Sequence, residues 1–129
     1  MTIFSKIIAG EIPAYTIAQN DLYYAFLDIF PVARGHVLVV PKEPVDKFFD
    51  LSDELLAGML VFAKPIARSI EKNFPCNRVG ISVIGLEVPH AHMHLIPING
   101  IADMDFSKKL KLSSEEFTAI RDTIISGLE

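Results

Sequence analysis

The segment His90–Ile96 alternates histidine with apolar residues, and this pattern constrains the chain more than any other. Histidine stands at positions 90, 92 and 94, and the apolar residues at 91, 93 and 95 separate and follow them. Side chains of a β-strand alternate between its two faces, so the three imidazoles would share one face while the apolar residues enter a core. On a helix the same positions spread around the axis and do not converge. The pattern therefore predicts a strand that presents three imidazole rings together.

Length and composition indicate one compact globular domain that spans residues 1–129. The chain contains 50% hydrophobic and 22% charged residues and has no long polar or low-complexity tract. Its formal net charge is -4, which argues against a nucleic-acid partner because phosphate backbones are usually met by a basic patch. A bound phosphate would therefore be held locally, by a few residues.

The sequence also indicates the compartment. Cys76 is the single cysteine and cannot form an internal disulfide bond, and the first residues lack the long apolar stretch of a signal peptide. No run reaches the roughly 20 apolar residues that a membrane-spanning helix requires. We therefore expect a cytoplasmic protein that has no membrane partner.

Hydrophobic spacing predicts the order of the secondary-structure elements. Helices are expected over residues 3–9, over residues 53–72 and from the capping box at 113–116 to residue 128. Strands are expected over residues 15–19, 22–28, 36–40, 79–84 and 90–96, and the strand at 36–40 is apolar enough to be buried on both faces. Pro65 lies inside the long helix, where it should remove one backbone hydrogen bond and bend the helix near Val61.

Three interpretations of the histidine row are open at this point. A structural row that happens to use histidine is disfavoured, because three of the four histidines lie within five residues. A zinc site would use neutral imidazoles, but alternate strand residues are about 7 Å apart at Cα, and three in a row rarely reach one ion. A phosphate-transfer site would use the central ring, His92, as nucleophile and its neighbours to bind phosphate oxygens. His36 is the remaining histidine that could complete such a pocket.

Residues His90–Ile96 resemble the motif of the histidine triad (HIT) family, in which histidines alternate with apolar residues and two apolar residues end the segment. Ile3–Pro13 is similar to the family's opening block. Ala25–Pro31 and Gly35–Lys42 are similar to its second block. Together the blocks extend the resemblance over residues 3–97, and the chain is most similar to the Hint-like, HIT-hydrolase branch.

The resemblance implies an α+β, HIT-like fold with a five-stranded antiparallel sheet and a long central helix, to which the predicted C-terminal helix is added. It implies a homodimer that binds a purine nucleotide and cleaves a substituent from the α-phosphate. Phosphoramidates, adenylated compounds and dinucleoside polyphosphates are the implied substrate classes. Neither a metal nor another cofactor is implied.

The resemblance also implies a role for each of the four histidines. His92 would form a covalent nucleotidyl intermediate, which water then hydrolyses to release a nucleoside monophosphate. His94 would contact the phosphate, and His90 would fix the tautomer and orientation of His92. His36 would extend the hydrogen-bond network behind them.

Nucleoside recognition is expected to involve Asp28 and four apolar residues. By the family pattern Asp28 accepts hydrogen bonds from both ribose hydroxyls, a task suited to a carboxylate because it offers several lone pairs and no donor. At least two of the four apolar residues are expected to touch the base. They are Phe4, Ile7, Phe26 and Ile29.

The chain departs from the family pattern near its start. Thr2 and Ser5 stand where many relatives carry two cysteines, and Pro44 stands where they carry a histidine. In some members these positions build a structural zinc site. That zinc site is expected to be absent from this chain.

A second departure precedes the triad. Leu86 stands where the family commonly has glutamine, and Glu87 stands where a serine or threonine often assists the leaving group. Ser82 is another candidate for a hydroxyl that contacts the phosphate or leaving group. A carboxylate repels phosphate unless it is protonated or turned away, so Glu87 is a hypothetical selector of cationic leaving groups such as a lysine amine.

Two functions of different class are consistent with these features. The first is a nucleotidyl hydrolase or transferase, which the intact triad favours because binding alone needs no nucleophile between two other imidazoles. The second is a nucleotide-binding adaptor with little or no turnover, which the altered segment before the triad leaves open. Replacing His92 by alanine separates them, because only an enzyme loses turnover while it keeps binding.

Overall fold

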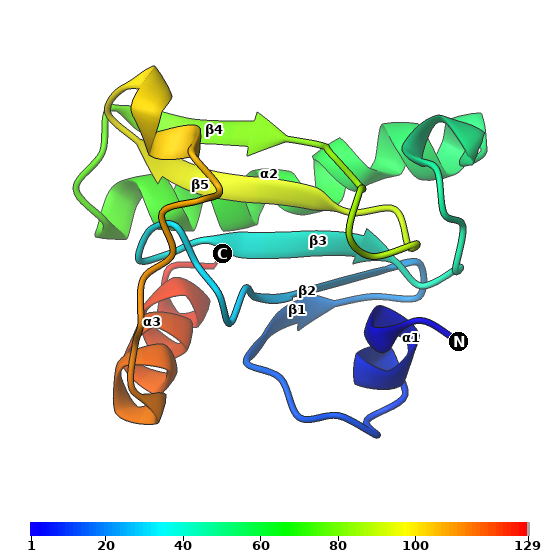
Figure 1. Ribbon diagram of the computed structural model, residues 1–129, viewed down its shortest axis with the longest axis horizontal. Helices are drawn as coiled ribbons and strands as arrows, with labels where there is room; N and C mark the ends of the chain where they lie inside the picture. The colour runs from blue at the N-terminus through cyan, green and yellow to red at the C-terminus, as the bar shows by residue number, and fades with distance from the viewer. Residues whose placement is uncertain (129) are drawn as a thin grey trace.

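The computed structural model describes residues 1–128, which form a five-stranded antiparallel sheet with helices on both of its faces (Figure 1). The α+β prediction is therefore confirmed. The strands are β1 (Thr16–Gln19), β2 (Tyr23–Leu27), β3 (Val37–Pro41), β4 (Arg78–Ser82) and β5 (Met93–Ile98). The helices are α1 (Ile3–Ile8), α2 (Asp53–Asn73) and α3 (Ser114–Ser126), with short 3-10 helices η1 (Phe48–Asp50) and η2 (Ile101–Met104). The strand order is β1-β2-β3-β5-β4, so β1 and β4 form the edges.

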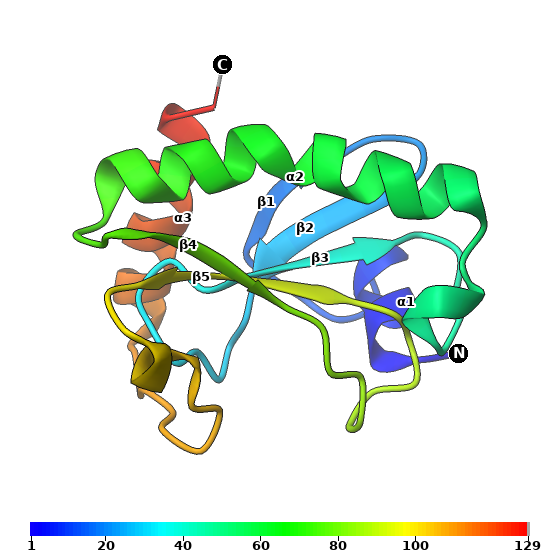
Figure 2. The ribbon, with the colours of Figure 1, turned by 90° about the horizontal axis from the view of Figure 1, so that it is seen from above.

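The sheet separates two hydrophobic clusters. Figure 2 shows α2 along one face, while α1 and the loops before and after β5 lie on the other. Residues 23, 25 and 27 of β2 and residues 37 and 39 of β3 pack toward α2 and α3, and the residues between them join Phe4 of α1 in the second cluster. All five residues of β3 are buried, as its apolar sequence predicts. The second face is the one on which polar residues and loops can surround a ligand.

The starts of the two longer helices are capped by serine side chains. Ser52 caps α2, its hydroxyl accepting a hydrogen bond from the backbone N–H of Leu55 at 3.2 Å. Ser113 and Glu116 form the expected capping box at the start of α3. The helix α2 continues through Pro65 to Asn73. Within residues 1–128, no helix combines the length and the apolar character that crossing a membrane requires.

The predicted strand over residues 90–96 is wrong at its start, because β5 begins only at Met93. The backbone N–H of His90 bonds to the carbonyl of Val88 at 2.8 Å, and that of Ala91 bonds to the carbonyl of Val45 at 2.7 Å. These N–H groups are therefore not available to a neighbouring strand. Strand alternation positions the last histidine of the triad, whereas the first two are placed by the turn before β5.

Replacing Gly58 by alanine is expected to destabilise the fold although alanine favours helix. A Cβ at this position of α2 would lie 2.2 Å from the hydroxyl oxygen of Tyr23, which donates a hydrogen bond to the carbonyl of Leu55. Overpacking of this kind costs about 1 to 3 kcal/mol. Chemical denaturation would measure the loss, and adding Tyr23→Phe should recover part of it. Gly100→Ala, where a Cβ meets open space, is the matched control, and equal effects of the two alanines would contradict the prediction.

Candidate active site

A cavity of about 620 Å³ opens on the face of the sheet opposite α2. Its size falls within the range of roughly 300 to 1,000 Å³ that is usual for small-molecule sites. Apolar side chains of α1 and β2 form much of its wall, together with the loop at residues 84–88 that precedes the triad. His92 and His94 also line the cavity. The arrangement therefore places two imidazoles at the wall of a largely apolar chamber.

The structure brings most of the sequence-predicted substrate residues to this cavity. All four candidates for the base pocket line it, as do Asp28 and Glu87. Ser82 is not among the lining residues; it ends β4, where it pairs with His94 in the sheet. Six of the seven predicted substrate-binding residues thus share one chamber. The lining members are Phe4, Ile7, Phe26, Asp28, Ile29 and Glu87.

The ring of His92 is oriented by the backbone of His90. Its Nδ1 lies 2.7 Å from the carbonyl oxygen of His90. A carbonyl oxygen can only accept, so Nδ1 of His92 carries the proton and donates it. The neutral ring then keeps an unprotonated Nε2 whose lone pair is free. Phe4 packs edge-on against this ring, with the centroids 5.1 Å apart, and fixes its plane from the other side.

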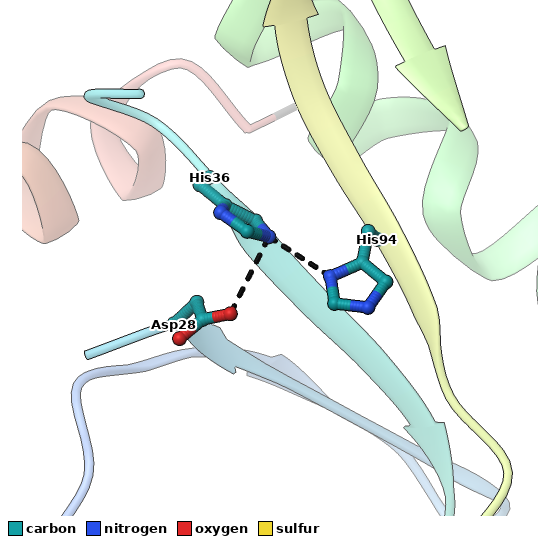
Figure 3. A group of neighbouring side chains, drawn as sticks. All are labelled: Asp28, His36 and His94. Atoms are coloured by element: carbon teal, nitrogen blue, oxygen red, sulfur yellow. Dashed lines mark hydrogen bonds and ion pairs between the residues drawn. The ribbon is translucent and has the colours of Figure 1, made fainter. Parts of the chain in front are cut away.

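His36 and His94 form a buried hydrogen-bonded pair (Figure 3). The partners of the two rings define the tautomer of each. Nδ1 of His36 accepts a hydrogen bond from the backbone N–H of Val32 at 3.1 Å, so the proton of the neutral ring is on Nε2. That Nε2 lies 2.9 Å from Nδ1 of His94 and donates to it. The proton of His94 is consequently on its own Nε2, on the far side of the ring from His36. His94 is thus prepared as a hydrogen-bond donor.

His90 is fully buried and faces α1 instead of the cavity. Its Nε2 donates to the carbonyl of Pro41 at 2.8 Å, which leaves Nδ1 to accept from the hydroxyl of Thr2 at 2.7 Å. Thr2 also caps α1 and hydrogen-bonds to Ser5. The three imidazoles therefore do not form one exposed row. The first ties α1 to the sheet, and the other two line the chamber with centroids 5.1 Å apart.

Asp28 lies at the end of β2, between the cavity and His36. One of its carboxylate oxygens accepts the backbone N–H of Phe30 at 2.8 Å, and the other is 3.5 Å from Nε2 of His36. The side chain is only 14% exposed. Because a carboxylate has about four acceptor positions, Asp28 retains capacity for donors that enter the cavity.

The side chains of Asp28, His36 and His94 are close enough to suggest a metal centre, with candidate ligand atoms within 4.8 Å of one another. A metal ion would require a lone pair on Nε2 of His36. That nitrogen carries the proton, however, because Nδ1 of the ring is occupied by the N–H of Val32. The arrangement therefore suits a chain of hydrogen bonds better than a set of metal ligands.

Burial keeps the histidines of this network neutral. Burial is the main factor that lowers the pKa of His94 from 6.5 to about 3, and the charges of His36, His92 and Lys109 lower it further. Burial likewise lowers the pKa of His36 to about 4, although the carboxylate of Asp28 opposes this shift. The pKa of His90 is lowered for the same main reason. These three rings are therefore neutral near pH 7, and the tautomers derived above apply there.

Phe106 and Lys109 are among the lining residues to which the sequence analysis gave no role. They belong to the loop between β5 and α3, to which no role was assigned. The ring of Phe106 packs edge-on against that of His94, with the centroids 4.7 Å apart. The ammonium group of Lys109 lies 5.3 Å from the centroid of Phe106. Neither residue belongs to a periodic pattern, so the sequence offered no signal for their position.

The depressed pKa of His94 makes the stability of the protein depend on pH. In the unfolded chain the ring takes up a proton below about pH 6.5, but in the fold it resists protonation until about pH 3. The free energy of unfolding should therefore be highest above pH 6.5 and decrease as the pH falls, by about 3 kcal/mol at pH 4 from this ring alone. Denaturant titrations of the parent and His94→Asn from pH 7 to pH 4 would measure this, and the variant should have the smaller pH dependence. Equal slopes would contradict the prediction.

Comparisons with known proteins agree with the fold and the motif. The HIT domain model matches residues 9–100. The adenosine 5'-monophosphoramidase of Schizosaccharomyces pombe is 40% identical over 96 residues, which cover 74% of this chain and 72% of that protein. A protein named Hit from Bacillus subtilis is 37% identical and covers 78% and 73% of the two chains. The crystal structure of a HIT-like protein from Bartonella henselae superposes with a TM-score of 0.86 at 27% identity, covering 98% of this chain and 96% of that one. The chain therefore belongs to the HIT domain family.

Proposed function

We propose that this protein is a nucleotidyl hydrolase or transferase that cleaves a substituent from the α-phosphate of a purine nucleotide. The observation that carries the proposal is the set of hydrogen-bond partners of His92 and His94 at the cavity wall, from which the tautomer of each ring follows. One ring offers a lone pair on Nε2 and the neighbouring ring offers an N–H donor. A nucleophile beside a hydrogen-bond donor is what displacement at phosphorus requires.

In the first step Nε2 of His92 attacks the α-phosphorus. The nitrogen–phosphorus bond forms while the bond from phosphorus to the leaving group breaks, and the leaving group departs with the bonding electrons and takes up a proton from solvent. His92 retains its proton on Nδ1, so the carbonyl of His90 stabilises the positive charge that develops on the ring. The N–H of His94 donates to a nonbridging oxygen of the phosphate and stabilises the charge there.

In the second step water attacks the phosphorus of the nucleotidyl-His92 intermediate. The new oxygen–phosphorus bond replaces the bond to Nε2, which recovers its lone pair; the water loses a proton to solvent, and a nucleoside monophosphate is released. In a transferase, another nucleophile takes the place of water. Because the water enters where the leaving group left, both steps use the same donors.

The rest of the cavity suits a nucleoside. The apolar walls formed by Phe4, Phe26 and Ile29 match the flat faces of a purine base, and Asp28 is placed to accept hydrogen bonds from ribose hydroxyls. The relative from Schizosaccharomyces pombe is named as an adenosine 5'-monophosphoramidase. This name supports adenosine as the nucleoside and an amine as one leaving group.

The proposal predicts a covalent adduct on His92. After brief mixing with adenosine 5'-phosphoramidate at mildly acidic pH, mass spectrometry should detect an adenylyl group on this residue, and AMP should accumulate. His92→Ala should form no adduct and lose turnover by about 10³-fold or more, as expected when a nucleophile is removed, while it still binds AMP.

The alternative function, a nucleotide-binding adaptor, gives a different result in the same experiment. Saturable binding of AMP by the parent protein, with neither adduct nor AMP release, would replace the enzyme by the adaptor. In that case the departures from the family pattern at Leu86 and Glu87, which line the cavity, would be the first place to look for the lost activity.

We also propose that two copies of the chain form a homodimer through the β4 edge of the sheet. Within residues 1–128 this edge strand pairs only with β5, and Ile81 of β4 is 52% exposed. Val61, on α2, is 73% exposed. Uncovered apolar side chains beside an unpaired strand edge favour association.

Analytical ultracentrifugation would test the dimer. The parent protein should sediment as a dimer, and Ile81→Lys should shift it toward monomer because the new charge would be buried at the interface. Leu22→Lys, at an exposed position in the turn between β1 and β2, is the control and should leave the dimer intact. A monomeric parent, or a dimer that tolerates Ile81→Lys, would exclude an interface at β4.

A further inference from the structure

The loop between β5 and α3 brings a positive charge to the wall of the cavity. Among the described residues that line the chamber, Lys109 is the only lysine or arginine. It lies outside every segment that resembles the family motif. The cavity also contains two carboxylates, Asp28 and Glu87, so its remaining fixed charges are negative. A phosphate that enters such a chamber needs a compensating positive charge.

The position of this loop is defined by hydrogen bonds. The backbone N–H of Leu110 donates to the carbonyl of Pro31 at 2.7 Å, which ties the loop to the segment that follows β2. The carboxylate of Asp105 accepts the backbone N–H of Ser107 at 2.9 Å and its hydroxyl at 2.6 Å. Phe106, whose ring packs on His94, lies between the residues of these two sets of hydrogen bonds. The side chain of Lys109 is therefore presented at the histidine end of the cavity.

Contacts of the aromatic ring show which end of the cavity the ammonium group faces. Phe106 lies edge-on to His94, and its centroid is 6.1 Å from that of His36. The ammonium group of Lys109 is 5.3 Å from the centroid of Phe106. Its charge also acts on both buried histidines, where it contributes to the lowering of their pKa values. This is the end at which a phosphate must lie if His92 is to attack it.

Neighbouring lysines in the loop differ in their partners. Lys108 faces the carboxylate of Asp105 at 3.9 Å and is 72% exposed. Lys109 makes no ion pair with any residue in the range 1–128. Its charge is thus left for a ligand, whereas that of Lys108 is partly compensated within the loop. The adjacent pair provides a matched control for experiments.

We propose that Lys109 is a specificity-determining residue that binds the anionic phosphate end of the nucleotide and favours ligands with more negative charge beyond the nucleoside. The inference rests on the proposed function and names a determinant of its substrate class. A lysine ammonium acts as a point charge on phosphate oxygens and strengthens their binding without demanding one geometry. Substrates with a phosphate or polyphosphate leaving group should therefore gain more from Lys109 than substrates with a neutral amine.

Isothermal titration calorimetry with three ligands would test the proposal. Adenosine, AMP and α,β-methylene-ADP share the nucleoside and differ in charge, and none of them requires turnover to be measured. Lys109→Gln should lower the affinity for AMP about fivefold or more and the affinity for the diphosphate analogue further. The affinity for adenosine should change by less than about twofold. Lys108→Gln should leave all three affinities near those of the parent. Lys109→Arg should retain most of the phosphate-dependent affinity, and thermal melting would confirm that each variant is folded.

Each result of the titration decides between distinct conclusions. The proposed role of Lys109 is wrong, while nucleotide binding stands, if Lys109→Gln binds all three ligands like the parent. The same conclusion follows if the substitution lowers the affinity for adenosine as much as the affinity for AMP. If Lys108→Gln has the same effect as Lys109→Gln, the loop acts through its general charge and the specific role is again wrong. If the parent binds none of the three, the role of Lys109 and the proposed function fail together.

Discussion

The hydrogen bond between His36 and His94 is the interaction on which the geometry of the candidate site depends. It joins the residue before β3 to the second residue of β5, at the buried wall of the cavity, where an imidazole without partners would cost free energy. The N–H of Val32 occupies Nδ1 of His36, so His36 must donate its hydrogen bond to His94 through Nε2. As a result, the only proton of the neutral His94 ring is on the nitrogen directed away from His36. A change at either end of this series of hydrogen bonds would alter the tautomer of His94 at the cavity.

The two faces of the sheet have separate tasks. The face covered by α2 and α3 contains the larger hydrophobic cluster, and the opposite face carries α1, the cavity and the loops around it (Figure 2). Alternation along β5 turns His94 toward the cavity because Met93 and Leu95 are buried in the larger cluster. At the other end of the site, the hydroxyl of Thr2 caps α1 and also hydrogen-bonds to His90. The hydroxyl of Thr2 thus holds the first helix against His90, whose ring in turn bonds to Pro41 of β3.

Much of the fold was predictable because it follows local rules. Apolar periodicity located all three helices and all five strands to within a few residues, and the capping box at 113–116 marked the start of α3. The start of β5 was mistaken because the histidine pattern looks like a strand throughout. Backbone hydrogen bonds to Val88 and Val45, which lie outside the partner strands β3 and β4, decide where pairing begins. Such contacts leave no periodic trace in the sequence.

The sequence by itself indicated His92, His94, Asp28 and four apolar residues that the structure brings to the cavity, because the family motif and the blocks before it specify these positions. The tertiary structure decided the tautomers of the histidine rings. These depend on backbone groups of residues 32, 41 and 90, whose positions the side-chain pattern of the sequence does not indicate. It also decided that Ser82 lies away from the cavity while Phe106 and Lys109 line it. A loop without periodicity takes its position from the contacts it makes, and those exist only in the folded chain.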